Sequence, residues 1–100
     1  AGLIPDNFEL SQNYPNPFNP STSIQFALPC QCRVNLKIFN LLGQEVKVLV
    51  SGILDEGTHT TRLNADDMAS GVYIYRIYAQ PINGEKSNIF INSKKLSLIK

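Results

Sequence analysis

The sequence predicts an all-β fold, an immunoglobulin-like antiparallel β-sandwich of six to seven short strands. Apolar and polar residues alternate along several short segments, turn-forming residues separate these segments, and no stretch of ten or more residues has apolar residues at helical spacing. With 100 residues, 43% of them hydrophobic, the chain has room for one domain and enough apolar material for one core.

The first two predicted strands cover residues 23–28 and 34–38, and Pro29 ends the first because a proline cannot donate a ladder hydrogen bond. Alternate side chains share one face of a strand, which we expect to point inward. The inward side chains are Ile24, Phe26 and Leu28 in the first strand and Val34, Leu36 and Ile38 in the second.

Further strands are predicted at 45–50, which Gly43 introduces, and at 59–64, which is short and polar. We expect a loop from Ser51-Gly52 to Glu56-Gly57 between them. The connection over residues 64–71 is expected to hold one helical turn, capped by a side-chain oxygen of Asn64 or Asp66.

Residues 72–80 form the longest predicted strand, and both of its faces are largely apolar or aromatic, which is typical of a central strand. Asn83-Gly84 predicts a hairpin turn, since both residues tolerate positive φ, and residues 85–91 are expected to return as the partner strand. A final strand is predicted at the C-terminus, with Leu96 and Leu98 facing the core.

The charge pattern excludes several classes of partner. The chain has 9 Lys and Arg against 8 Asp and Glu, a balance that argues against nucleic acid as a partner. No apolar run approaches the roughly 20 residues that cross a bilayer, so we expect no stable membrane insertion. The net charge is −3 over residues 1–72 and +4 over 73–100, which places the positive charge at the C-terminal end.

The sequence predicts no catalytic residue, no metal site and no cofactor. His59, the only histidine, lies between two threonines on a polar strand, which favours an exposed side chain over a catalytic triad. Cys30, Cys32 and His59 are one ligand short of a tetrahedral zinc site, so two incidental thiols are expected, although a strained bridge would form if the loop folded back. The acidic pairs Asp55-Glu56 and Asp66-Asp67 favour loop solvation and capping over a cation site.

A proline-rich ribbon is the most unusual stretch of the chain. Its prolines exclude a helix, its asparagines can close Asx turns, and its two aromatic side chains are expected to pin it to the sandwich. The ribbon is interpreted as a cover that blocks pairing at a sheet edge, and a docking surface for another protein fits the same residues. Its residues are Tyr14, Pro15, Asn16, Pro17, Phe18, Asn19 and Pro20.

The ribbon and its flanks, Phe8 to Ile24, closely resemble the opening of the type A C-terminal sorting domains of the type IX (Por) secretion system of Bacteroidota. Residues 34–46 resemble the second block of that family, residues 63–77 the third, and residues 94–100 the basic and apolar tail. The chain departs from the family at Leu63, where Trp is common, and in a longer segment between residues 77 and 94.

This resemblance implies a non-enzymatic export signal. Such domains carry an N-terminal cargo protein from the periplasm through the outer-membrane type IX translocon to the cell surface or medium, and a sortase-like protease typically removes them. The expected organisation is a linker remnant at 1–7, the ribbon at 8–23 and the β-sandwich at 24–100. The chain begins with Ala and shows no basic and apolar leader, so we expect either a mature product or a piece of a longer polypeptide, and we favour the piece.

The resemblance also implies which residues carry the signal, and the basic C-terminal end fits an acidic receptor surface. They are Gly71, Val72 and Tyr73 in the glycine turn and Lys94, Lys95, Leu96, Leu98 and Lys100 in the tail. Deletion of residues 96–100 is expected to abolish secretion and to leave a folded domain.

The alternative is an immunoglobulin-like accessory module that binds carbohydrate or packs on a parent secreted enzyme. Tyr73, Tyr75 or Tyr78 would then form an exposed aromatic platform. A flat aromatic face would favour the module, whereas buried tyrosines and an exposed tail would favour the export signal. A free edge strand would also allow a weak homodimer.

Overall fold

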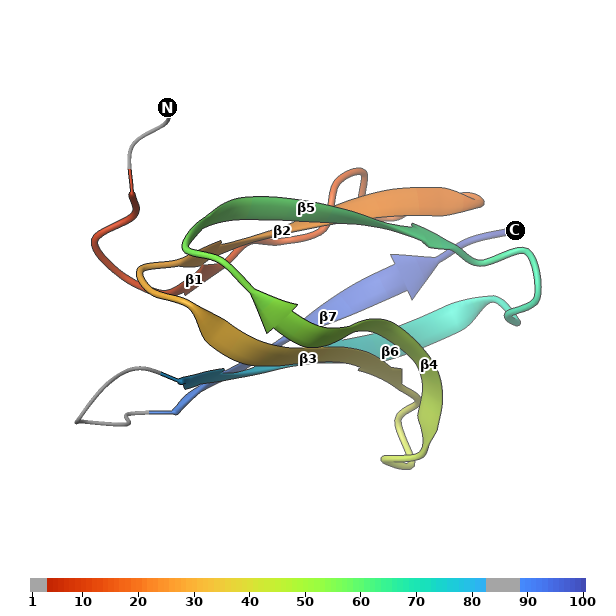
Figure 1. Cartoon of the computed structure of the whole chain (residues 1–100). Coiled ribbons are helices and arrows are strands. Elements are labelled where there is room, and N and C mark those ends of the chain that lie inside the picture. The colour runs from red at the N-terminus through yellow and green to blue at the C-terminus, as the bar shows by residue number, and fades with distance from the viewer. Residues whose placement is uncertain (1–3, 83–88) are drawn as a thin grey trace.

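The computed structural model describes residues 4–82 and 89–100, which form a β-sandwich of two antiparallel sheets (Figure 1). One sheet has the order β1-β2-β5 and the other the order β4-β3-β6-β7. The strands are β1 (Glu9–Leu10), β2 (Ser21–Leu28), β3 (Cys32–Phe39), β4 (Glu45–Leu54), β5 (Gly57–Asn64), β6 (Gly71–Pro81) and β7 (Phe90–Leu98). Within the described ranges no residue is helical, and accordingly no helix there could span a membrane.

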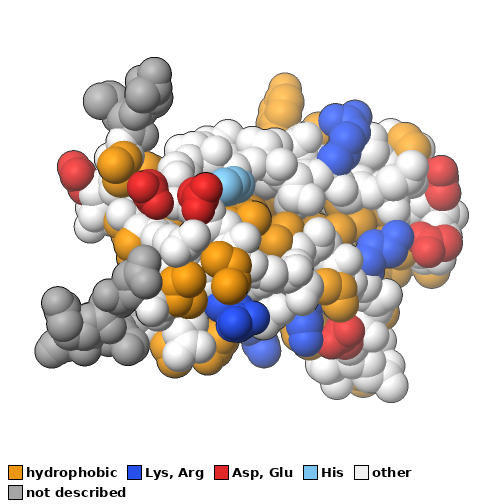
Figure 2. Space-filling model, in the orientation of Figure 1, with side chains coloured by type: hydrophobic (Ala, Val, Ile, Leu, Met, Phe, Trp, Pro, Cys, Tyr) orange, Lys and Arg blue, Asp and Glu red, His pale blue; other side chains and the backbone are white. Residues whose placement is uncertain are grey.

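The core lies between the two sheets, where the alternation of the sequence predicts it. Every predicted inward side chain of β2 and β3 is buried, because successive side chains point to opposite faces of a strand. β6 adds Tyr75, Ile77 and Ala79 from the other side of β3, all fully buried. Hydrophobic atoms show along the seam between the two sheets in Figure 2.

The prediction that residues 72–80 form a central strand is confirmed, because β6 pairs with β3 on one side and β7 on the other. Only one face of β6 is buried, however. Val72 and Arg76 are exposed on the outer face, and Ile74 and Tyr78 are half-buried there. The aromatic and apolar residues of that face therefore lie on an open sheet surface.

β4 is longer than predicted, and the loop expected from Ser51-Gly52 is wrong at its start. β4 continues to Leu54 because it pairs with β3 along its whole length, with Ser51 opposite Asn35. The pairing shows two register shifts, between Leu36 and Lys37 and between Ile38 and Phe39. Such irregularities bend and twist an edge strand.

The helical turn expected over residues 64–71 is wrong, because a tight turn takes its place, but Asn64 supplies the capping oxygen that was predicted. The Asp66 amide donates to Asn64 Oδ1 at 3.0 Å, and the Met68 amide donates to the Ala65 carbonyl at 3.0 Å. Ala65 and Met68 are buried. Because these two side chains enter the core, the connection runs across the end of the sandwich and does not form a helix.

Among residues 89–100, one continuous strand covers positions that were predicted to belong to two. β7 runs from Phe90 to Leu98 and pairs with β6 from Ala79 to Gly71. The predicted Asn83-Gly84 turn and most of the strand predicted at 85–91 lie outside the described residues. β1, a two-residue strand that pairs with β2, was not predicted, since two residues carry no periodic signal.

Candidate functional site

The structure brings the predicted tail and the predicted glycine turn together at one end of the sandwich. The start of β6 pairs with the end of β7, so that Gly71 lies opposite Leu98 and Tyr73 opposite Leu96. This is the end where the chain terminates in Figure 1. Two segments that lie more than 20 residues apart in the sequence thus form one surface.

The predicted signal residues divide into exposed and buried groups. Val72 is 40% exposed, and Lys95 and Lys100 are also exposed. Leu96 and Leu98 are buried to 1% exposure or less, as predicted for a final strand. The other members are the exposed Gly71 and the half-buried Tyr73 and Lys94. The exposed group can contact another molecule, whereas the leucines hold the strand in the core.

The backbone of Gly71 explains the glycine at the start of β6. Its φ is 152°, a conformation that L side chains rarely adopt, and a Cβ atom there would meet nothing within 4 Å. The constraint is therefore one of backbone conformation and not of space. Two residues along, the Tyr73 hydroxyl donates to the Ala69 carbonyl at 2.6 Å, which ties the strand to the connection before it.

The proline-rich ribbon lies along the outer edge of β7, so the interpretation as an edge cover is confirmed for the tail. The Phe18 amide donates to the Ser97 carbonyl, and the Ile99 amide donates to the Phe18 carbonyl, both at 3.0 Å. Gln12 Nε2 also donates to the Lys95 carbonyl at 2.7 Å. The ribbon thus satisfies the backbone groups that β7 would otherwise present as an open sheet edge.

The Asn16 side chain makes a long-range hydrogen bond instead of a local one. Its side-chain oxygen accepts a hydrogen bond from the Ser97 amide at 2.9 Å, 81 residues away, and so joins the ribbon to the tail. The sequence predicts an Asx turn at this position, and this long-range partner takes the place of a local one. An asparagine oxygen accepts equally well from any nearby amide, so only the fold decides the partner.

The two aromatic residues of the ribbon differ, contrary to the prediction that both pin it. Phe18 is 2% exposed and packs in the core, whereas Tyr14 is 80% exposed. Tyr14 contributes its backbone instead, through two hydrogen bonds of 2.9 Å with Ser23. The prediction is right for Phe18 and wrong for the Tyr14 side chain.

The residue that does hold the ribbon's start is Tyr75, which sequence analysis missed in this role. Its hydroxyl donates to the Ser11 carbonyl at 2.6 Å and accepts from the Asn13 amide at 2.9 Å. Burial raises the pKa of Tyr75 to about 12. The buried Asn13 side chain donates in turn to Thr22 Oγ1 and to the Pro15 carbonyl, both at 3.1 Å.

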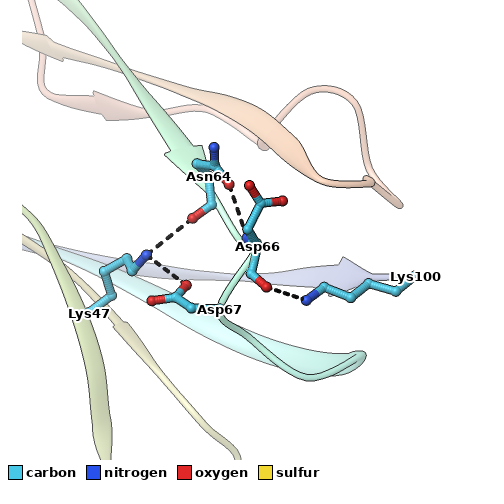
Figure 3. A network of polar contacts seen from close by, with 5 residues as sticks. All are labelled: Lys47, Asn64, Asp66, Asp67 and Lys100. Carbon is cyan, nitrogen blue, oxygen red and sulfur yellow. Dashed lines mark hydrogen bonds and ion pairs between the residues drawn. The ribbon is translucent and has the colours of Figure 1, made fainter.

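A polar network closes the same end of the sandwich (Figure 3). Lys100 Nζ donates to the Asp66 carbonyl at 2.8 Å, and from the other side Lys47 Nζ donates to the Asn64 carbonyl and to Asp67 Oδ1, each at 3.1 Å. The hydrogen bond and charge of Lys47 lower the pKa of Asp67 below its ordinary value. The terminal lysine is therefore anchored to the connection between β5 and β6.

The fold brings charges of opposite sign together at the C-terminal end of the sandwich. On the face that Figure 2 displays, several basic side chains gather at the lower middle beside an acidic one, and other acidic side chains lie at both ends. The folded chain brings Lys47 to the Asp67 carboxylate, and the charge of Lys100 also helps to lower the pKa of Asp67. Charges that are far apart in the sequence thus offset one another at the C-terminal end.

The aromatic platform of the accessory-module alternative is not formed by the described residues. Tyr73 and Tyr75 point into the sandwich, and only Tyr78 reaches the outer face of its sheet. A shallow hollow of about 250 Å³ lies beside Tyr78, where Arg76 stacks over Phe39 at 4.9 Å from the ring centroid. One tyrosine beside an arginine-covered phenylalanine does not make a flat stacking surface.

The other candidate residues lie away from this end. His59 stacks on Phe26 with ring centroids 5.5 Å apart, and its Nε2 lies 2.8 Å from the Asp55 carbonyl. Cys30 and Cys32 are free thiols whose sulfur atoms lie 3.9 Å apart. Within residues 4–82 and 89–100, no three His, Cys, Asp or Glu side chains are grouped as metal ligands.

The fold defines the class of the protein as an all-β sandwich module. A family model described as "Secretion system C-terminal sorting domain" matches residues 12–95, and the chain therefore belongs to the Por secretion system C-terminal sorting domains. Members of this family are signal modules, generally non-catalytic, and the domain implies a secreted protein that interacts with the type IX machinery. No curated protein and no solved structure matches the chain.

Proposed function

We propose that one end of the sandwich, which we call the clasped end, is the surface by which the type IX machinery recognises this domain. We define the clasped end as the start of β6, the end of β7 and the ribbon segment 12–18 that is bonded to them. The observation that supports this proposal is the convergence of three segments that each resemble a family block. In a chain that belongs to the family, such convergence favours one shared recognition surface.

Within this surface, Val72, Lys95 and Lys100 are the contact residues, because their side chains reach solvent. Leu96 and Leu98 act by holding β7 in register from the core. Since the ribbon occupies the backbone groups of β7 between Lys95 and Ile99, the machinery reads this end through side chains and not by adding a strand.

The proposed pathway follows from the family. A cargo protein precedes the domain and crosses the inner membrane by the general secretory route, and the translocon then exports both parts to the cell surface or medium. A sortase-like protease cleaves in the linker, near or before Ala1-Gly2. Residues 8–23 and 24–100 remain together as one unit, since the ribbon is bonded to β7.

The test is export of a fluorescent reporter that carries a general secretory leader and this domain as its C-terminal part. We expect the reporter at the surface or in the medium of a host with the type IX machinery, and in the periplasm of the same host without the translocon. Periplasmic retention of the folded domain in both strains would contradict the proposal, and glycan binding would then test the accessory-module alternative.

A matched pair of variants tests the surface itself. Lys95 and Arg33 are both exposed and both lie on the outer face of the four-stranded sheet, at opposite ends of it. We expect Lys95→Glu to reduce translocon-dependent export strongly and Arg33→Glu to leave it unchanged. Equal effects of the two substitutions would show that export responds to overall charge and not to this end of the domain.

A further inference from the structure

The two cysteines form a close pair in a part of the molecule that the proposed function does not use. Cys30 lies in the short turn between β2 and β3, and Cys32 is the first residue of β3. They are at the opposite end of the sandwich from the clasped end (Figure 1). The chain bends at Pro29 and Cys30, which brings the two side chains to the same side of the turn.

The geometry of this pair favours a reaction between the two sulfur atoms. Their distance is 3.9 Å, which is van der Waals contact, against about 2.05 Å in a disulfide. The Cys32 thiol donates to the Cys30 carbonyl at 3.2 Å, which holds the Cys32 sulfur beside Cys30. We propose that Cys30 and Cys32 are a modification site, at which a small disulfide-bearing oxidant or oxidoreductase converts the two thiols into an intramolecular disulfide.

The different exposure of the two thiols sets the order of the steps. Cys30 is partly exposed and lines a hollow of about 340 Å³ between the β2–β3 turn and the β4–β5 turn, whereas Cys32 is fully buried. Burial and the neighbouring Cys30 raise the pKa of the Cys32 thiol to about 12, so Cys32 is a poor first nucleophile. An oxidant therefore meets Cys30 first.

The reaction balances as two thiol–disulfide exchanges. Cys30 Sγ loses its proton and attacks one sulfur of the oxidant, which forms a mixed disulfide and releases the first thiolate. Cys32 Sγ then loses its proton and attacks the sulfur of Cys30, which forms the Cys30–Cys32 bond and releases the second thiolate. The two protons end on the two released thiols, and the oxidant is reduced by two electrons.

The compartment in which this occurs rests on the proposed function, because transit through the periplasm exposes the domain to oxidants that the cytosol lacks. The ring spans only three residues, so it restricts the unfolded chain little. Its effect is local. It locks the crossover between the two sheets, and it removes both thiols before they can bond to another chain.

The test uses the purified chain, first reduced and then treated with cystamine, a small cationic disulfide suited to a hollow lined by Asp55 and Glu56. Intact mass is measured after alkylation with N-ethylmaleimide. We expect the wild type to lose the mass of two hydrogens and to take up neither cysteamine nor maleimide. The Cys32→Ala variant should keep one cysteamine on Cys30, and Cys30→Ser should not react while folded.

A wild-type protein that retains a cysteamine adduct, forms intermolecular dimers or stays reduced while Cys32→Ala reacts would overturn the proposal. The outcome does not depend on export, so failure of the reporter experiment would count against the proposed function alone. In the exporting host, alkylation of the acid-quenched reporter should find both thiols blocked, and full alkylation of exported reporter would contradict oxidation during transit.

Discussion

The two edges of the four-stranded sheet are protected in different ways. At the β7 edge, a ribbon from the start of the chain supplies hydrogen-bond partners to residues 95–99. At the β4 edge, no such cover is present among the described residues, and the strand carries two register shifts and an inward-pointing lysine, Lys47. Both devices oppose edge-to-edge pairing, but only the first also joins distant segments into one surface.

This difference bears on how each edge can interact with another molecule. Among the described residues, the outer edge of β4 has no strand partner, so it could pair in the weak homodimer that the sequence suggests. Its irregular register nevertheless disfavours a continuous new strand. The β7 edge is closed, and its side chains are held in defined positions. A surface that another protein must recognise in one geometry is therefore better placed on the β7 edge than on the β4 edge.

The largest expected effect is deletion of residues 96–100, which should unfold the domain. The sequence analysis predicts that this deletion abolishes secretion and leaves a folded domain, but Leu96 and Leu98 are fully buried core residues and their strand is bonded to the ribbon. Circular dichroism should show loss of the cooperative thermal transition. Leu98→Ala alone should destabilise by about 2–5 kcal/mol, and Ile99→Ala, at 57% exposure, should change the free energy of unfolding by less than about 0.5 kcal/mol. If the truncated chain melts like the wild type, residues 96–100 do not contribute to the stability of the fold.

The next effect separates the two ribbon aromatics. Phe18→Ala should cost about 3–5 kcal/mol, since the ring is buried in the core beside β7. Tyr14→Ala, which removes a side chain that is 80% exposed, should cost less than about 0.5 kcal/mol. Urea unfolding of both variants measures the difference. Similar losses would mean that Tyr14 also packs on the sandwich.

Tyr75→Phe should have an intermediate effect, because it leaves the Ser11 carbonyl and the Asn13 amide without their shared partner. We expect a loss of about 1–3 kcal/mol, the cost of buried polar groups that lose a partner. Denaturant unfolding measures it. A neutral substitution would indicate that water replaces the hydroxyl, and would weaken the role assigned to Tyr75 at the ribbon.

The same residue gives a pH dependence. The folded-state pKa of Tyr75 is about 12, above its ordinary value of 10.0. The contribution of the protonated Tyr75 hydroxyl to the free energy of unfolding is therefore complete below pH 10. It is lost as the pH rises toward 12, because the unfolded chain releases this proton first. The slope should be about 1.4 kcal/mol per pH unit in that window. Tyr75→Phe is the control, and an equal slope in the variant would assign the effect to other groups.

The smallest expected effect lies at the β4 edge. Lys47→Met should bring the pKa of Asp67 back up toward its ordinary value, because the lysine supplies the hydrogen bond and charge that lower it. A carboxyl-detected nuclear magnetic resonance titration measures this shift. The contribution of the pair is present above the ordinary pKa of Asp67 and is lost as the pH falls. An unchanged Asp67 titration would show that the pair does not form in solution.

Local pattern was sufficient for much of the fold. The alternation in residues 23–28 and 34–38 identified both strands and the side chains they bury, and Leu96 and Leu98 were placed correctly in a final strand. The boundaries were less accurate, because pairing with a neighbour decides how far a strand extends. β4 continues through Gly52 for this reason.

The sequence by itself determined the β-sandwich class, the inward faces of the main strands and the family, since period-two alternation and motif order are written along the chain. Only the tertiary structure decided that Phe18 is buried and Tyr14 exposed, that Asn16 bonds to Ser97, and that Tyr75 holds the ribbon. These hydrogen-bond partners lie 62 to 81 residues apart, so they depend on how the two sheets and the ribbon pack together, which no local periodicity predicts.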